Sequence, residues 1–74
     1  MIENPRNVRF EDLIRVVEGF GFRLDRISGS HHIYKLPGIR QLINLQNVGG
    51  MAKAYQVKQF LELVEEYDLR LEDE

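Results

Sequence analysis

The amino-acid sequence predicts an α+β fold in which two helices pack on one face of a three-stranded antiparallel sheet. Two segments of helical periodicity stand near the ends of the chain, and three short segments rich in β-forming residues lie between them. Short turns join the successive strands, which favours an antiparallel meander over a parallel sheet. Helices grouped on one side of such a sheet form an α+β sandwich, so the other sheet face should stay partly open.

The first helix is expected to begin at Phe10. Its apolar residues recur at the spacing of one helical face: Phe10, Leu13, Ile14, Val17 and Phe20. Glu11 and Asp12 in the first turn complement the positive end of the helix dipole. Gly19 and Gly21 predict the end of this helix, with one of them in the left-handed conformation that closes many helices.

Three strands are expected over residues 22–27, 31–36 and 39–45. The first begins with alternating apolar and polar residues, and the second contains β-forming residues. Turns are expected at 28–30 and at the Pro-Gly pair that follows residue 36, because glycine, serine and proline favour tight reversals. Residues 47–51 are interpreted as a loop that leads into the second helix.

The second helix is expected from about residue 53 to residue 67. Its predicted apolar face consists of Val57, Phe60, Leu61 and Val64. Residues 1–8 are polar and contain a proline, so they predict a loose lead-in. The chain of 74 residues is long enough for one domain over 1–74, with its core at about 9–69.

Composition excludes several classes of functional site. The chain has no cysteine, which rules out disulfides, zinc–thiolate sites and cysteine nucleophiles. The only two histidines are adjacent, so we predict neither a metal site nor a cofactor. No apolar run approaches the roughly 18 residues of a membrane span. No leader-like pattern opens the sequence either, and a cytoplasmic protein is expected.

Charge is distributed unevenly along the chain. Residues 1–61 carry nine Lys or Arg and five Asp or Glu, a net charge of +4. Residues 62–74 carry one Arg and seven acids, a net charge of −6, which gives the total of −2. A modestly basic body is suited to binding phosphates. The acidic end is interpreted as a frayed, solvated tail.

His31 and His32 are the residues best suited to chemistry. Neighbours in a strand point to opposite faces, so His31 should share one face with Lys35 and His32 the other face with Tyr34. Histidine both takes and gives a proton in aqueous solution, so a histidine beside a glycine turn is a candidate for acid–base catalysis. A surface histidine without a role is the alternative interpretation of the same pattern.

The residues around the two histidines suit a phosphate. Backbone amides of Gly29 and Ser30 are candidates for a small anion site, although a turn glycine is also needed simply for its positive φ. Six basic residues near the strands and the second helix form either a phosphate-binding surface or ordinary surface charge: Arg23, Arg26, Lys35, Arg40, Lys53 and Lys58. Tyr34 and Tyr55 are candidates for stacking on bases, with at least one of them expected in the core.

The run Gly29-Ser30-His31-His32-Ile33-Tyr34-Lys35 resembles the motif of the HicA family of toxins, also called YcfA-like mRNA interferases. The order of elements resembles that family too, from a short helix ending in Gly-Phe to a Gly-Gly loop and a closing helix. The resemblance covers about residues 9–69. It implies an α-β-β-β-α fold like that of a double-stranded-RNA-binding domain. It also implies metal-independent cleavage of mRNA by the toxin of a type II toxin–antitoxin system, and neutralisation by a HicB antitoxin.

The same resemblance implies that His31, the first histidine after Gly-Ser, is catalytic. Our hypothesis is that it abstracts the ribose 2′-OH proton or, when protonated, assists the leaving 5′-oxygen. Backbone amides near Ser30, with Lys35, would stabilise charge on the phosphorane. His32, Tyr34 or a water is the candidate for the other half of the acid–base work. The RNA-binding residues predicted with His31 are Gly29, Ser30, Lys35, Arg26, Arg40, Lys53 and Lys58.

Two features depart from the family pattern. Many members carry another histidine and more basic residues after the third strand, where this chain has Gln46-Asn47-Val48-Gly49-Gly50. The acidic tail is also poorly suited to RNA. A non-catalytic RNA-binding or protein-interaction module of the same fold is therefore the alternative function.

Overall fold

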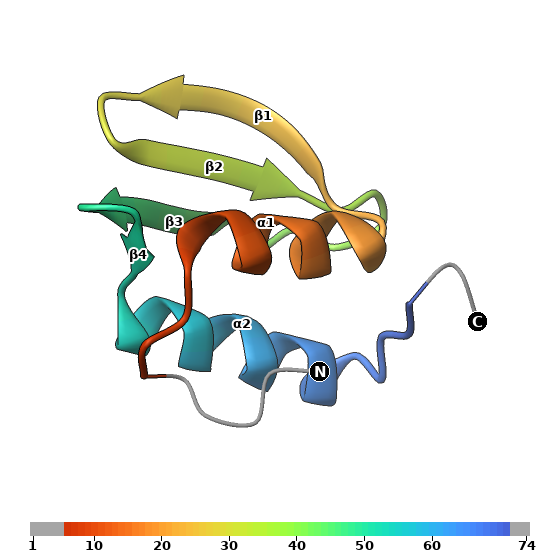
Figure 1. Ribbon diagram of the computed structural model, residues 1–74. Coiled ribbons are helices and arrows are strands. Elements are labelled where there is room, and N and C mark those ends of the chain that lie inside the picture. Colours follow the sequence, from red (N-terminus) through yellow and green to blue (C-terminus); the bar gives the residue numbers. More distant parts are fainter. Residues whose placement is uncertain (1–5, 72–74) are drawn as a thin grey trace.

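The computed structural model describes residues 6–71, which form two helices and a four-stranded antiparallel sheet. The helices are α1 (Phe10–Gly19) and α2 (Ala54–Glu66). The strands are β1 (Arg23–Ser28), β2 (His31–Lys35), β3 (Ile43–Val48) and β4 (Met51–Ala52). They lie in the order β1-β2-β3-β4 (Figure 1). The predicted α+β class is confirmed, and the prediction of three strands is wrong by one.

The third strand begins later than the expected residues 39–45. In the antiparallel register between β2 and β3, Tyr34 pairs with Ile43 and His31 pairs with Gln46. The pairs end at Tyr34 and Ile43, so residues 39–42 have no partner in β2. The Pro-Gly turn before them is confirmed, since Gly38 has a φ of +92°.

The loop expected over residues 47–51 is instead a tight hairpin. Val48 pairs with Met51 across Gly49 and Gly50, whose φ angles are +58° and +87°. Two central residues with positive φ are typical of a type I′ turn, whose twist matches that of paired strands. The two glycines therefore create the additional strand β4.

The segment before α1 is held against β4. The Ala52 N–H donates a hydrogen bond of 2.9 Å to the Val8 carbonyl, and Arg9 forms an isolated bridge with Met51. The prediction of a loose lead-in over residues 1–8 is therefore wrong at Val8. Residues 1–5 of that lead-in lie outside the described residues.

The end of α1 follows the glycine prediction. Gly21 has a φ of +96°, its N–H donates to the Glu18 carbonyl at 2.9 Å, and the Phe22 N–H donates to the Val17 carbonyl at 3.3 Å. This pair of hydrogen bonds is the Schellman motif, which satisfies two carbonyls at the helix end. The chain enters β1 directly after this motif.

The end of α2 uses the same motif with an aspartate in the glycine position. Asp68 has a φ of +51°, its N–H donates to the Glu65 carbonyl at 3.3 Å, and the Leu69 N–H donates to the Val64 carbonyl at 2.9 Å. Leu69 and Leu71 then pack against the core. The prediction of a frayed tail is therefore wrong as far as Leu71, and residues 72–74 lie outside the described residues.

The core lies between the two helices and one face of β2 and β3. The strands contribute Tyr34, Ile43 and Leu45, and the helices contribute Phe10, Leu13, Val17, Val57, Phe60 and Leu63. Phe60 of α2 meets Phe20 and Phe22 edge-on, with ring centroids 5.7 and 5.8 Å apart. The predicted apolar helix faces are confirmed, with Ile14, Leu61 and Val64 only partly buried at their margins.

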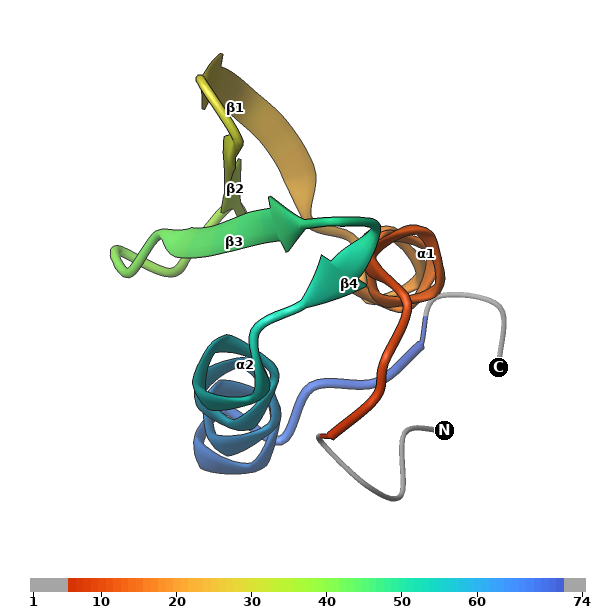
Figure 2. The same ribbon diagram turned by 60° about the vertical axis from the view of Figure 1, so that its left-hand side comes forward.

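The sheet curls so that the helices cover only part of it. Both helices pack mainly against β3 and β4, and β1 stands away from α2 (Figure 2). Every residue of β1 is exposed. No helix within residues 6–71 is long and apolar enough to cross a membrane.

Candidate active site

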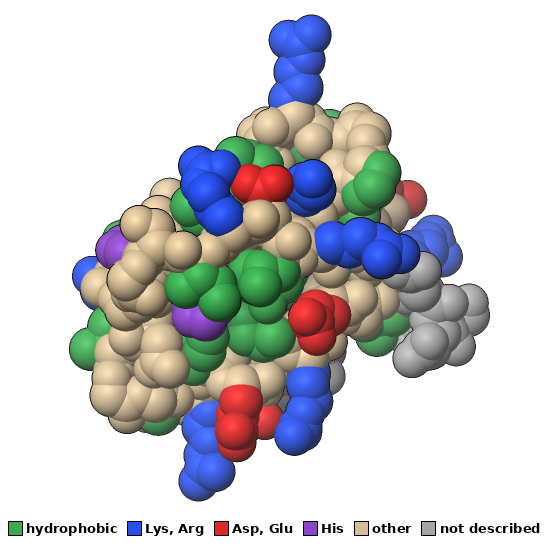
Figure 3. Space-filling view, turned by 90° about the horizontal axis from the view of Figure 1, so that it is seen from above, with side chains coloured by type: hydrophobic (Ala, Val, Ile, Leu, Met, Phe, Trp, Pro, Cys, Tyr) green, Lys and Arg blue, Asp and Glu red, His purple; other side chains and the backbone are tan. Residues whose placement is uncertain are grey.

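The two adjacent histidines lie on opposite faces of β2, as strand geometry predicted. His32 pairs with the buried Leu45, and its ring centroid lies 4.8 Å from that of Phe10. His31 pairs with Gln46 on the face that the helices leave open. We call this surface the outer face, formed by Arg23, Arg26, Ser28, His31, Ile33, Lys35, Asn44 and Gln46. In Figure 3, one of the two histidines lies among hydrophobic side chains.

A two-residue turn places His31 at the start of β2. Ser28 pairs with His31 across Gly29 and Ser30, and Gly29 has a φ of +60°, as a type II′ turn requires at its first central position. The prediction that Gly29 supplies positive φ is confirmed. A Cβ added to Gly29 would meet nothing within 4 Å, so the space beside this turn is open.

His31 is half-buried and hydrogen-bonded to a side chain of the next strand. Its Nδ1 lies 3.0 Å from Oδ1 of Asn44 on β3. Asn44 stands two residues before Gln46, the direct partner of His31, so it is a diagonal neighbour on the same face. Sequence reasoning missed Asn44, because the contact depends on the register between two strands and no local pattern marks it.

Two of the predicted RNA-binding residues lie on the outer face beside a carboxylate. Asp25 lies 2.8 Å from Nη1 of Arg26 and 3.4 Å from Nζ of Lys35. It occupies an irregularity in the pairing of β1 with β2, where the register shifts between Leu24 and Arg26. Asp25 was not among the predicted residues. Its charge offsets part of the positive charge here, and Figure 3 shows acidic side chains among the basic ones on the face it displays.

The other predicted basic residues lie elsewhere. Arg40 is exposed in the connection between β2 and β3. Lys53 immediately precedes α2, with its Nζ 5.8 Å from the centre of the Tyr55 ring, and Lys58 is exposed on that helix. Since α2 packs on the core side of the sheet, the structure separates these two lysines from the outer face. The structure thus brings Gly29, Ser30, Arg26 and Lys35 together with His31, in one hairpin.

Lys35 stands at the opposite end of β2 from His31. Four residues of extended strand place their Cα atoms about 13 Å apart. Lys35 therefore lies too far away to contact the same phosphate as the backbone around Ser30.

Comparison with protein-family models decides the family of the chain. The model described as HicA toxin of bacterial toxin-antitoxin matches residues 10–65, well over half of the chain. The chain belongs to the HicA toxin family. The matched segment includes the Gly-Ser-His-His turn and both helices almost completely. No curated protein and no solved structure matches the chain.

Membership makes this HicA chain a toxin of a toxin–antitoxin system, which implies a partner that neutralises it. The family match does not name the residues that act chemically, so they must be identified from the geometry of this chain. Within residues 6–71, no three His, Asp or Glu side chains come together as the ligands of a metal ion would.

Tyr34 of this HicA domain belongs to the core and not to the outer face. It is 3% exposed, and burial raises the pKa of its phenol, with the negative charge of Glu18 as a second cause. Tyr55 is 56% exposed on α2. The prediction that at least one of the two tyrosines is a core residue is confirmed by Tyr34.

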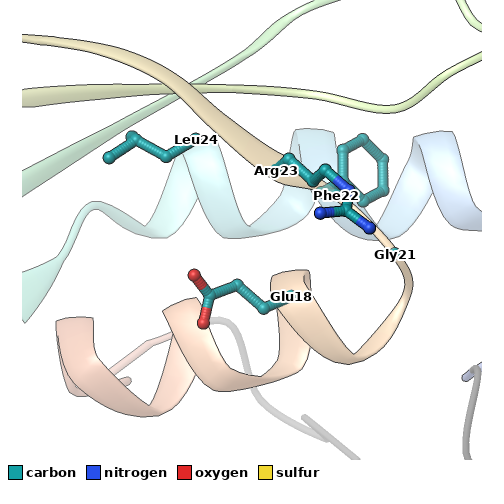
Figure 4. Close-up of a pocket in the computed structure, with 5 residues that line it drawn as sticks. All are labelled: Glu18, Gly21, Phe22, Arg23 and Leu24. Carbon is teal, nitrogen blue, oxygen red and sulfur yellow. The ribbon is translucent and has the colours of Figure 1, made fainter.

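A hollow of about 420 Å³ lies between α1 and β1 (Figure 4). Glu18 comes from α1, whereas Arg23 and Leu24 come from β1. Leu24 pairs with Tyr34, which places this hollow on the core side of the hairpin. Neither histidine lines it. The hollow is thus separate from the outer face of this HicA chain.

Proposed function

We propose that this HicA-family toxin is a metal-independent endoribonuclease that cleaves mRNA, with His31 as its proton-transfer residue. The observation that carries the proposal is the placement of His31. It is half-buried on the helix-free face of the sheet, directly after the open Gly29 turn. A histidine in such a place is accessible to a nucleic-acid strand, and its ring is held by the strand that carries it.

The proposed reaction transfers one proton through His31. Neutral His31 takes the proton of a ribose 2′-OH, whose oxygen attacks the adjacent phosphorus. The bond from phosphorus to the 5′-oxygen breaks, and that oxygen leaves with a proton from a water molecule. The imidazolium of His31 then returns its proton to the hydroxide that remains. The products are a 2′,3′-cyclic phosphate and a 5′-hydroxyl end. Positioned proton transfer of this kind contributes a rate factor of about 10²–10⁴.

The proposed RNA contacts follow the β1–β2 hairpin. Backbone amides at Gly29 and Ser30 border open space next to His31 and are suited to a phosphate there. Arg26 and Lys35 lie further along the outer face and are suited to neighbouring phosphates. We expect a smaller contribution to RNA binding from Arg40, Lys53 and Lys58, because they lie outside this hairpin.

Water, and not a second side chain, is our candidate for the other half of the acid–base work. His32 faces the core side and contacts Phe10. Tyr34 is buried, and its raised pKa makes it a poorer proton donor. Neither shares the outer face with His31.

We include in the proposal a HicB-type antitoxin as the partner, a cytoplasmic location, and a likeness of the fold to double-stranded-RNA-binding domains. The apolar side of the hairpin favours a protein partner. Leu24 is 44% exposed and Ile27 is 54% exposed, and Ile27 pairs with His32. This surface is also what the alternative function, a non-catalytic protein-interaction module, would use.

Matched alanine variants at the two histidines test the proposal. The purified chain is incubated with mixed RNA in EDTA, and products are separated by electrophoresis and checked for cyclic phosphate ends. We expect cleavage by the parent and by His32→Ala, and none by His31→Ala. The substitutions are chemically identical and adjacent, but they fall on opposite faces of β2.

Circular dichroism of all three proteins provides the control for folding. Cleavage that survives in folded His31→Ala would rule out the assigned role. Intact RNA with every folded protein, together with salt-dependent retention of RNA, would favour the non-catalytic RNA-binding module. Loss of cleavage only in His32→Ala would move the chemistry to the other face of the sheet.

A further inference from the structure

Among residues 6–71, Asn44 is the one side chain within hydrogen-bond distance of the His31 ring. Its Oδ1 lies 3.0 Å from Nδ1 of His31, and both side chains project from the outer face. The contact joins β2 to β3, so two paired strands determine where the imidazole points. A diagonal pair on one sheet face is within reach of side chains of this length.

The chemistry of the two groups defines the direction of this hydrogen bond. A carboxamide oxygen accepts hydrogen bonds and cannot donate them. The Nδ1 atom of His31 must therefore carry the proton that it shares with Oδ1 of Asn44. In the neutral ring, the lone pair is then left on Nε2.

We propose that Asn44 is a positioning residue that keeps a proton on Nδ1 of His31 and thereby makes Nε2 the atom that exchanges a proton with RNA. This inference rests on the proposed ribonuclease function for its catalytic part. Its structural part, the tautomer of His31, stands independently of any activity.

The other residues around His31 are consistent with Asn44 orienting the imidazole ring. Its direct partners across the sheet are Ser28 and Gln46, which are uncharged. The basic residues of the outer face, Arg23, Arg26 and Lys35, stand at other positions of the hairpin, and Asp25 forms ion pairs with the last two. Asn44 is also neutral, so it selects one nitrogen without attracting a second proton to the ring as a carboxylate would.

The tautomer is measured directly by nitrogen-15 NMR of the parent chain, at a pH where His31 is neutral. We expect the resonances of the Nδ1–H form, with Nε2 unprotonated. In Asn44→Ala the population should move towards the Nε2–H form, because the acceptor at Nδ1 is lost. A parent that already shows the Nε2–H form overturns the inference, whether or not the protein cleaves RNA.

Cleavage kinetics measure how the hydrogen bond from His31 to Asn44 affects catalysis. Asn44→Ala should lower kcat by about 10-fold with little change in KM, as a partial loss of the roughly 10²–10⁴-fold that positioned proton transfer supplies. Asn44→Asp keeps an acceptor oxygen and should recover most of kcat. Its added carboxylate should move the acid limb of the pH–rate profile to higher pH, because a nearby negative charge favours the imidazolium.

Gln59→Ala is the control for the loss of an amide side chain. Gln59 is exposed on α2, which packs on the core side of the sheet, so both kcat and the tautomer should stay near those of the parent. An unchanged kcat in Asn44→Ala, measured with an active parent, contradicts the positioning role. If the parent itself does not cleave RNA, the proposed function fails, and the NMR result alone still decides whether Asn44 fixes the ring.

Discussion

At the scale of single residues, Tyr34 links burial to a measurable pH dependence. Its pKa is raised in the folded chain by burial and by Glu18, so folding favours the neutral phenol. The unfolded chain loses this proton above pH about 10. The unfolded state then binds fewer protons than the folded state, and the free energy of unfolding falls as pH rises through this range. Denaturant unfolding at a series of alkaline pH values should show that fall, and Tyr34→Phe should reduce it.

Tyr55→Phe is the control for this prediction. The Tyr55 side chain is 56% exposed, so removing its hydroxyl should leave the alkaline slope of the parent almost unchanged. Phenylalanine at position 34 keeps the aromatic packing against the core. Identical slopes for the parent and Tyr34→Phe would show that this phenol does not cause the alkaline loss of stability.

Also at the residue scale, the sequence predicted His31 but not the side chains that act on it. Alternation along a strand is a local property, so the opposite placement of His31 and His32 could be deduced. The contact with Asn44 depends on the pairing of residue 31 with residue 46, which no local signal sets. Asp25 sits at a shift in register, and its ion pair with Lys35 of the next strand is hidden from the sequence for the same reason.

At the scale of elements, the end of α2 carries a residue that is poorly suited to its backbone. Asp68 has a φ of +51°, a conformation that glycine adopts without steric cost. Its side chain is highly exposed and meets Arg70 only at 3.8 Å, so little is lost when it is removed. We expect Asp68→Gly to raise the free energy of unfolding by about 0.5–1 kcal/mol, because the roughly 1–2 kcal/mol steric cost of a left-handed residue exceeds the roughly 0.5–1 kcal/mol that glycine's freedom in the unfolded chain costs.

Thermal unfolding measures this effect. For a domain of this size, such a gain corresponds to an increase in Tm of roughly 2–8 °C. Asp68→Ala serves as the control, because it removes the same carboxylate and ion pair but keeps a Cβ. A gain of equal size in the alanine variant would indicate that charge, and not backbone conformation, limits this helix end.

Also at the scale of elements, helices were easier to predict than strands. Each helix carries its own periodic apolar face, and glycine marks the end of α1 through a local hydrogen-bond motif. The third strand was displaced because Ile39 and its neighbours have strand-forming character but no partner in β2. The two residues of β4 are too few for any periodic signal, and Val8 and Arg9 hold them from a distant part of the chain.

At the scale of the whole molecule, the proposed RNA surface is limited to one side of the sheet. Replacing Arg26 and Lys35 together by glutamine should weaken RNA binding and lower the salt dependence of the binding constant. The slope of log K against log salt should fall by about 1.4, since each lost phosphate contact on a single strand contributes about 0.7. The His31→Ala background allows binding to be measured by fluorescence anisotropy without cleavage.

The double variant Lys53→Gln and Lys58→Gln is the matched comparison. It removes the same charge from the chain, but from the start and body of α2 on the core side of the sheet. We expect its slope to stay close to that of the parent. Equal decreases of this slope in the two double variants would mean that RNA binding depends on the total charge of the molecule and not on the outer face.

The separation of the two faces of β2 and β3 also affects how the chain can diverge. Tyr34 and Leu45 fill the core, whereas Ile33 and Asn44, one position earlier in each strand, lie on the outer face. Exposed positions usually tolerate substitution within about 0.5 kcal/mol, and core positions do not. Under the proposed function, selection for folding and selection for RNA binding therefore act on alternate residues of the same strands. Lineages of this toxin can change target preference through one set of residues while the other set preserves the fold.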